Sequence, residues 1–226
     1  MKSLLVVLLM VIAKVAVGQD EKDQTPSALF KVVPQNFVDN TLKIGTEFFN
    51  KSRSKSVSIF VYGRFDSDPN SGPFYYGENR YKGLGGEAQY RKYISPLQPY
   101  VTRRNKNYLR GIYVAGYIQG ASYSNEGNYI SSHYDRNTGQ YTSTVVNVHE
   151  SIGNWGTGFT IGVHRTLWNV LFIDAYVGGG IQWSDVIRTV SPPVNPNYSG
   201  YYYTGITSPG YQGIMPKFGI QLGIPL

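Results

Sequence analysis

The sequence contains no cysteine, and this absence excludes disulfides, thiolate metal sites and an acylated cysteine behind a signal peptide. Long apolar runs are also missing: beyond the amino terminus no stretch approaches the roughly 18 consecutive apolar residues of a transmembrane helix. Helical periodicity is lacking after residue 27. The abundant residues, which include 20 tyrosines and 26 glycines, favour strands and turns. The composition therefore predicts an all-β protein.

The amino terminus has the pattern of a cleavable secretory signal peptide. Lys2 provides the basic start, an apolar run follows over 4–13, and Ala16 and Gly18 supply the small residues of a cleavage site. We therefore expect cleavage before Gln19. The predicted organisation is a signal peptide (1–18), a short periplasmic tail (19–26) and a single β domain (27–226).

Two runs separated by three residues form the clearest hairpin. Apolar residues or glycine occupy every second position of Leu171–Trp183, and Thr157–Leu167 alternates in the same way except at Thr157 and Arg165. This is the period of strands whose two faces meet different environments. A turn centred on Asn169 keeps the two faces matched, and it pairs residues whose numbers sum to 338. This register places His164 opposite Asp174, close enough for an imidazole–carboxylate hydrogen bond.

The same alternation recurs along the chain and predicts eight strands. The connections after the third, fifth and seventh strands (66–82, 122–154 and 184–213) are long and polar, whereas those after the second, fourth and sixth are short or moderate. This pattern predicts an eight-stranded antiparallel up-and-down transmembrane β-barrel, with its long loops outside the cell. The predicted strands are 27–34, 41–49, 56–65, 83–93, 109–121, 155–167, 171–183 and 215–226.

The polarity of the two faces favours a membrane barrel over a soluble one. A soluble lipocalin-like barrel would hold its apolar face inside, whereas here one face carries charges along most strands and the other carries Leu, Ile, Val, Phe and small residues. Arg165 and Lys92 are exceptions on the apolar face, near the short-turn end, where they can snorkel. Lys31 is a further cation of the charged face. The polar network predicted for the lumen is Lys43, Glu47, Arg64, Glu87, Arg91, His164, Asp174 and Lys217.

Three segments carry a resemblance to known proteins: Ala28–Phe65, Gly83–Tyr93 and Pro216–Ile220. They resemble the small outer-membrane β-barrel proteins of Gram-negative bacteria, with their eight-stranded OmpA/OmpX-like architecture. The end of the chain is similar to the outer-membrane assembly signal, although it ends in Leu226 and not in an aromatic residue. The resemblance implies the barrel fold, the cell outer membrane as location, and outer-membrane lipid, lipopolysaccharide and the barrel-assembly machinery as partners. It implies no catalytic residues.

The interior of eight strands is just wide enough for side chains to fill it, so we do not expect a general porin. The sequence offers no ordered catalytic signature and no metal-ligand spacing on one strand face, so we expect no enzyme, metal or cofactor site. The basic clusters at 51–55 and 103–106 lie on short connections, where we expect contact with phospholipid headgroups and no nucleic acid. Tyrosines gather in the long loops with Ser, Gly and Asn, a composition typical of recognition surfaces. A structural or surface-interaction role, with an extracellular glycan or protein as partner, is the expected function.

Two alternatives stay open at the level of sequence. His133–Asp135 and His149–Glu150 in the long connection 122–154 allow a lipid-modifying outer-membrane barrel enzyme, although no ordered Ser/His/Asp signature accompanies them. The other alternative is a secreted soluble β-barrel that binds a small apolar ligand.

Overall fold

The computed structural model describes residues 26–65, 80–94, 98–102, 105–135, 139–167, 171–191 and 208–226. The predicted signal peptide, nearly all of the predicted tail and most of the 66–82 connection lie outside these residues. The described chain is almost entirely β, and none of its helices is long and apolar enough to cross a membrane. Its elements are β1 (Ala28–Val32), η1 (Pro34–Asp39), β2 (Thr41–Phe49), β3 (Lys55–Arg64), β4 (Arg80–Tyr93), β5 (Gln98–Thr102), β6 (Asn105–Asp135), β7 (Gln140–Leu167), β8 (Leu171–Ser191) and β9 (Gly213–Pro225).

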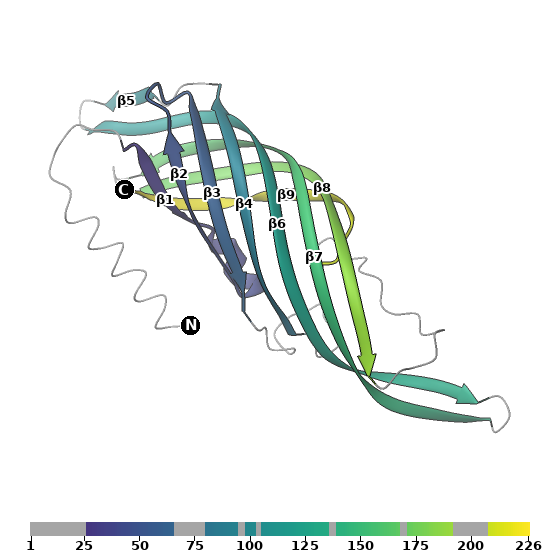
Figure 1. Ribbon diagram of the computed structural model, residues 1–226. Coiled ribbons are helices and arrows are strands. Elements are labelled where there is room, and N and C mark those ends of the chain that lie inside the picture. Colours follow the sequence, from purple (N-terminus) through teal and green to yellow (C-terminus); the bar gives the residue numbers. More distant parts are fainter. Residues whose placement is uncertain are drawn as a thin grey trace, which may run out of the picture.

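Eight antiparallel strands close into a ring (Figure 1). Neighbours in the chain pair with one another from β1 to β4 and from β6 to β9, and the pairings β4–β6 and β1–β9 close the circle. The predicted eight-stranded, up-and-down antiparallel order is therefore confirmed. The short strand β5 is additional and pairs only with the start of β6, where a plain connection is predicted. Its Pro99 suits this place, because proline is tolerated on an edge strand.

The register of the β7–β8 hairpin agrees with the predicted pairing of residues whose numbers sum to 338. Partners run from Leu167 and Leu171 to Trp155 and Trp183, and each pair sums to 338. Beyond this span the same register continues without a shift as far as Ser191. The turn centred on Asn169 lies outside the described residues, but the register on both sides fixes its length at three residues.

Three strands continue well past their predicted ends. The segment 122–154 is predicted as a loop, yet β6 and β7 cross most of it as a hairpin that reaches beyond the other strands (Figure 1). Strand β8 likewise extends into the predicted loop 184–213. The predicted loop boundaries are therefore wrong.

Side chains in this extension alternate between buried and exposed, as expected of a strand. Val148 and Ile152 are buried on the inner side, whereas His149 and Ser151 between them are exposed. Gly139 at the turn has φ 68°, the left-handed conformation that a tight hairpin requires. The polarity of the segment misleads, because an alternating strand needs only half of its residues to be apolar.

The described ring is irregular between β2 and β9. Strand β1 ends after five residues, because Pro34 lacks an N–H and begins the 3₁₀ helix η1. Asn40 at φ 51° ends the helix in the left-handed conformation. Since η1 packs against both β2 and β9, it occupies the place where a longer β1 would continue.

Over Gly213–Gln221, β9 pairs with β8 alone, and its other edge faces η1. The even-numbered residues direct their backbone N–H toward this edge, since Leu226 donates to Ala28 and Ile220 to the Gln35 side chain. Pro216 is an even-numbered residue without an N–H, so it leaves one donor fewer to satisfy at this edge. We call this place the β2–β9 seam.

Inward-facing aromatic rings lie against glycines of neighbouring strands. A Cβ atom added to Gly162 would lie 2.3 Å from the ring of Tyr113, which is fully buried. Gly45 receives Phe60 in the same manner, at 2.5 Å. The narrow interior therefore accommodates large rings only because the facing positions lack a side chain.

Prediction one concerns this packing. We expect Gly162→Ala to lower the free energy of unfolding by about 1–3 kcal/mol, because the new methyl group overlaps the buried Tyr113 ring. Gly153→Ala on the same strand is the matched control, since a Cβ there meets nothing within 4 Å. Urea unfolding in detergent micelles measures both variants. Equal stability of the two would contradict the packing.

Candidate functional site

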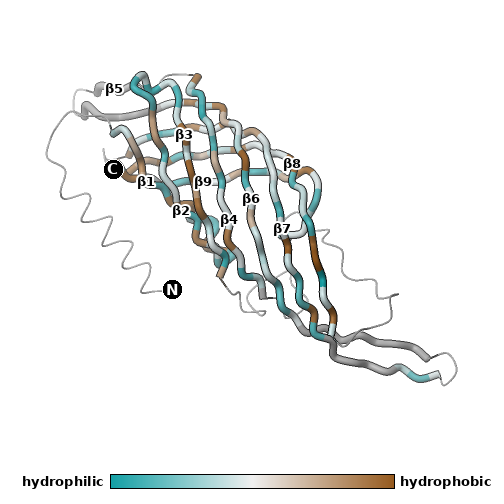
Figure 2. The backbone as a smooth tube through the Cα atoms, in the orientation of Figure 1, coloured by the Kyte–Doolittle hydropathy of each residue, from teal (hydrophilic) through white to brown (hydrophobic). Residues whose placement is uncertain are grey.

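The interior of the ring is polar. Side chains alternate between buried and exposed along β3 and β7, and in Figure 2 hydrophilic and hydrophobic residues alternate along most strands. The buried set includes seven charged residues that the ring encloses, whereas the exposed set is rich in Ile, Val and Phe. The seven are Lys31, Lys43, Glu47, Glu87, Arg91, Asp174 and Lys217.

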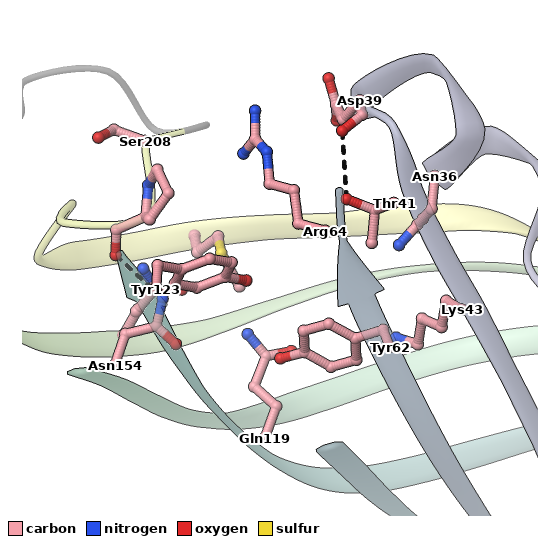
Figure 3. Close-up of a pocket in the computed structure, with 13 residues that line it drawn as sticks. Asn36, Asp39, Thr41, Lys43, Tyr62, Arg64, Gln119, Tyr123, Asn154 and Ser208 are labelled. Carbon is pink, nitrogen blue, oxygen red and sulfur yellow. Dashed lines mark hydrogen bonds between the residues drawn. The ribbon is translucent and has the colours of Figure 1, made fainter. Parts of the chain in front are cut away.

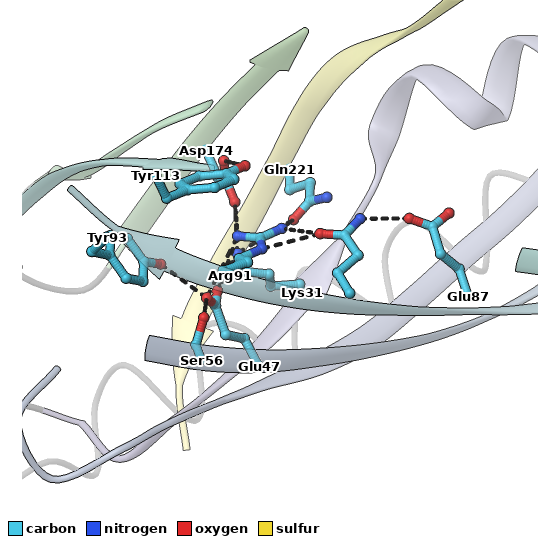
Figure 4. A network of polar contacts seen from close by, with 10 residues as sticks. Lys31, Glu47, Ser56, Glu87, Arg91, Tyr93, Tyr113, Asp174 and Gln221 are labelled. Atoms are coloured by element: carbon cyan, nitrogen blue, oxygen red, sulfur yellow. Dashed lines mark hydrogen bonds and ion pairs between the residues drawn. The ribbon is translucent and has the colours of Figure 1, made fainter. Parts of the chain in front are cut away.

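Four of these charges form the inner cluster: Lys31, Glu47, Arg91 and Asp174. They come from β1, β2, β4 and β8, and each is completely buried (Figure 4). Arg91 binds Glu47 at 3.3 Å and also pairs with Asp174. Lys31 lies 2.8 Å from Asp174 and pairs with Glu47 as well. Two cations and two carboxylates thus neutralise one another across the ring.

Neutral side chains complete the hydrogen bonding of the inner cluster. Tyr93 donates to Glu47 at 2.9 Å, and Tyr113 donates to Asp174 at 2.6 Å. Ser56 also donates to Glu47, and Gln221 accepts from Arg91 at 3.0 Å. Full pairing of this kind is what makes buried charge tolerable, since an unpaired buried ion costs several kcal/mol.

A second group lies farther along the strands. Lys43 and Lys217 both bind Glu87, at 2.5 and 2.8 Å, so this group carries an excess of one positive charge. Gln89 joins it to the inner cluster, because its amide donates to Glu87 while its carbonyl accepts from Arg91. The two groups are therefore one continuous network.

Two residues predicted for the network stand apart from it. Arg64 makes no ion pair with a described residue; its guanidinium lies 5.3 Å over the ring of Tyr81. His164 is paired with Asp174 in the β-ladder, as the register predicts. The predicted imidazole–carboxylate hydrogen bond is absent from the described contacts, however, and both ring nitrogens of His164 are buried without a partner.

His164 makes no hydrogen bond to Asp174 because other donors compete for that carboxylate. Asp174 already accepts hydrogen bonds from Lys31, Arg91 and Tyr113, so cations and a phenol occupy it. His164 instead packs among aromatic rings, with centroids at 5.4 Å for Phe172 and 6.2 Å for Phe49. Pairing in the β-ladder fixes the positions of the two backbones, but it does not decide which side chains form hydrogen bonds with each other.

Glu47, His164 and Asp174 offer ligand atoms within 4.8 Å of one another, the spacing of a metal site. Both carboxylates are already neutralised by Lys31 and Arg91. A divalent cation would therefore add uncompensated charge to a buried and balanced cluster. The arrangement fits a structural role better than metal binding.

A pocket of about 250 Å³ opens beyond the network, on the side of the extended β6–β7 hairpin (Figure 3). We call it the mouth pocket. Lys43 lines it and also belongs to the network below, through its ion pair with Glu87. The Arg64 side chain stands between Tyr123 and η1, and Tyr62 and Gln119 lie beneath it. The lining residues are Asn36, Asp39, Thr41, Lys43, Tyr62, Arg64, Gln119, Tyr123, Asn154, Gln182, Ser208, Pro209 and Met215.

Glycines of β4 make room for the two tyrosines of the mouth pocket. A Cβ atom on Gly83 would lie 2.2 Å from the Tyr123 ring, and one on Gly85 would lie 2.4 Å from the Tyr62 ring. The rings can therefore lie against the wall and leave the centre of the pocket open.

Side chains of β7 and β8 hold the segment that precedes β9 against the same pocket. Asn154 donates to the carbonyl of Pro209 at 2.9 Å, and Gln182 donates to that of Tyr211 at 3.1 Å. The walls of the pocket are thus fixed by hydrogen bonds from two further strands.

Sequence reasoning missed the neutral members of the network. Gln89 and Tyr93 share the parity of Glu87 and Arg91 on β4, which is the signal that places them on the same face. The mouth pocket was missed altogether, because its lining comes from segments far apart in the chain.

Prediction two tests the inner cluster. Arg91→Gln leaves Glu47 and Asp174 buried with one cation between them, so we expect a loss of about 3–5 kcal/mol in the free energy of unfolding. Arg165→Gln removes the same charge from an exposed position and should change stability by about 0.5 kcal/mol at most. A similar loss in both variants would show that total charge, and not the buried pairing, matters.

Prediction three tests the surroundings of His164. Phenylalanine keeps a ring among its aromatic neighbours and removes two unpaired nitrogens, so His164→Phe should raise the unfolding free energy by about 1 kcal/mol. His164→Ala, which leaves a cavity, should lower it. Destabilisation by phenylalanine would reveal a hydrogen bond to the imidazole.

Comparison of the chain with protein-family models, with curated proteins and with solved structures found no match. The function is therefore argued from the geometry of the ring, its interior network and its mouth pocket.

Proposed function

We propose that this protein is an outer-membrane β-barrel, preceded by a cleaved signal peptide, with a side-chain-filled lumen and a structural or surface-interaction role. The observation that carries the proposal is the polarity of the closed ring: paired charges inside and an apolar belt outside. Every backbone group inside a bilayer must be paired within the protein. The ladders of the closed ring meet this demand, and at the β2–β9 seam η1 covers the edge of β9 that no strand pairs.

The belt has the height of a bilayer core. On β7 the outward positions are apolar or threonine over the nine residues Trp155–Val163. At about 3.3 Å per residue and a tilt of about 35–45° they would span roughly 21–24 Å, close to the roughly 25 Å apolar band of membrane barrels. On β8 the outward apolar run ends at Trp183, which stacks on Trp155 at 4.2 Å. Paired tryptophans at that level suit a membrane–water interface.

Exposed charges bound the belt on both sides. Toward the short turns they are Lys55, Lys92 and Arg165, and toward the extended hairpin they are Lys82, Glu126 and Asp185. Between these two levels the exposed residues of the same strands are Ile, Val, Leu, Phe, Tyr, Trp, Ala and Thr, and the exposed Ser122 and Gly153 lie at the level of Asp185. A lipid-facing surface requires such limits, because charge at the bilayer midplane is costly and charge near the interface is not.

The interior argues against the two alternatives. A carrier of small apolar ligands needs an apolar cavity, whereas the ring encloses charges. The proposed dyad of a lipid-modifying enzyme is split by the pleat, since His149 is exposed and pairs with Glu126 at 3.5 Å while Glu150 is buried and pairs with Arg188. The side chain of His133 lies outside the described residues.

The extension of β6, β7 and β8 beyond the belt is the natural surface element. Glu150 holds it together by binding Arg188 at 2.6 Å and accepting from Asn125 at 2.8 Å. Its outward residues include the polar Glu126, His149 and Ser151 together with the exposed Ile187. We propose that an extracellular glycan or protein meets this extension, and that outer-membrane lipid, lipopolysaccharide and the assembly machinery are the partners of the belt.

Prediction four tests location and orientation together. Because the chain has no cysteine, single-cysteine variants report unambiguously. A membrane-impermeant maleimide should label Gln140→Cys at the hairpin tip on intact cells, and it should label the matched variant Lys51→Cys in the opposite turn only after lysis. The protein should fractionate with the outer membrane and migrate differently on gels before and after boiling.

Recovery of a stable protein from the soluble periplasm would refute the membrane location. Labelling of Lys51→Cys but not Gln140→Cys on intact cells would keep the location and invert the orientation.

A further inference from the structure

We propose that the mouth pocket binds an anion of monosaccharide size, a sugar acid or a sugar phosphate, and that Arg64 is the residue that holds its acidic group. The inference goes beyond the location proposed above. It can be tested on purified protein, so its failure would leave the membrane proposal standing.

The charge of the pocket favours an anion. Lys43 and Lys217 share the single carboxylate of Glu87 below the pocket, and Arg64 adds a third cation. Among the described residues that line the pocket, Asp39 is the only acid, and it is exposed on η1. The inner cluster lies farther from the pocket, and its two cations and two carboxylates give it no net charge. Over the part of the chain that the structure describes, positive charge therefore exceeds negative charge around the pocket.

Arg64 is placed to use this excess. Its Nε atom is buried and has no hydrogen-bond partner among the described residues, which is costly for a charged donor. The ring of Tyr81 supports the guanidinium at 5.3 Å. A planar guanidinium fits a carboxylate or phosphate through two parallel hydrogen bonds. An acidic group bound to the guanidinium would give Arg64 the ion-pair partner that it lacks among the described residues.

The rest of the lining suits a hydroxylated ring. Tyr62 and Tyr123 present flat aromatic faces together with phenol groups, and Asn36 and Gln119 add amides. Such groups donate and accept, as sugar hydroxyls do. The volume of about 250 Å³ lies below the roughly 300–1,000 Å³ of sites for drug-sized ligands, which limits the occupant to about one ring.

Isothermal titration calorimetry of the folded protein in detergent micelles tests the proposal with four probes: glucuronate, glucose 6-phosphate, glucose and inorganic phosphate. We expect saturable binding of glucuronate or glucose 6-phosphate, with glucose at least tenfold weaker. The tighter of the two anions identifies the acidic group. Inorganic phosphate should bind at least tenfold more weakly than glucose 6-phosphate, because it lacks the hydroxylated ring.

Variants separate Arg64 from general charge. Arg64→Gln should weaken binding of the preferred anion at least tenfold, Arg64→Lys should keep part of the affinity, and Arg165→Gln, which removes an equal charge from the outward face, should bind as the wild type does. A gel shift on boiling confirms that each variant is folded.

Several results would overturn the proposal: no saturable binding of either sugar anion, equal affinity for glucose and glucuronate, or unchanged affinity in Arg64→Gln. Equal affinity for inorganic phosphate and glucose 6-phosphate would also overturn it, because a bare phosphate site would then suffice. The comparison of probes uses wild-type protein, so it decides the matter even where a variant fails to fold.

Discussion

The pairing of Arg91 with Glu47 and Asp174 is the interaction on which the interior of this ring depends. It joins β4 to β2 and to β8, strands that share no ladder with β4, and Lys31 adds β1 to the same cluster. Burying four ions would be unfavourable if any one of them lacked a partner. The phenols of Tyr93 and Tyr113 and the amide of Gln221 supply the remaining bonds. The network therefore sets the separation of opposite walls, which ladder hydrogen bonds between neighbouring strands cannot do.

Much of the fold could be read from periodicity, because the alternation of side chains is a local property of each strand. The parity of Leu167 and Leu171 was enough to fix the whole β7–β8 register. Periodicity could not show where strands end. The extension of β6 and β7 has the composition of a loop, and only its pairing partner makes it a strand. The 3₁₀ helix η1 was likewise hidden, since Pro34 predicts the end of a strand but does not predict a helix after it.

The candidate sites were predictable to a lesser degree, for a physical reason. Parity correctly assigned Glu47, Glu87 and Arg91 to the inner face, because facing inward is decided within one strand. Which partner each charge takes depends on distances across the ring. His164 illustrates the difference: its position opposite Asp174 was predictable, but its loss of that carboxylate to Arg91 and Lys31 was not. The mouth pocket is harder still, because it takes its walls from β2, β3, β6, β7, β8, β9 and η1.

The seam and the mouth pocket are two aspects of one departure from regular structure. A longer β1 would pair the free edge of β9 and complete the ladder, but it would also remove η1, which brings Asn36 and Asp39 to the pocket. The chain instead ends β1 at Pro34, places Pro216 where one N–H would face the seam, and satisfies the N–H of Ile220 with Gln35. Departures of this kind cost pairing energy, and proteins keep them mainly where function requires them. The coincidence of the irregular seam with the unpartnered Nε of Arg64 is therefore the strongest reason to look for a ligand at this end of the ring.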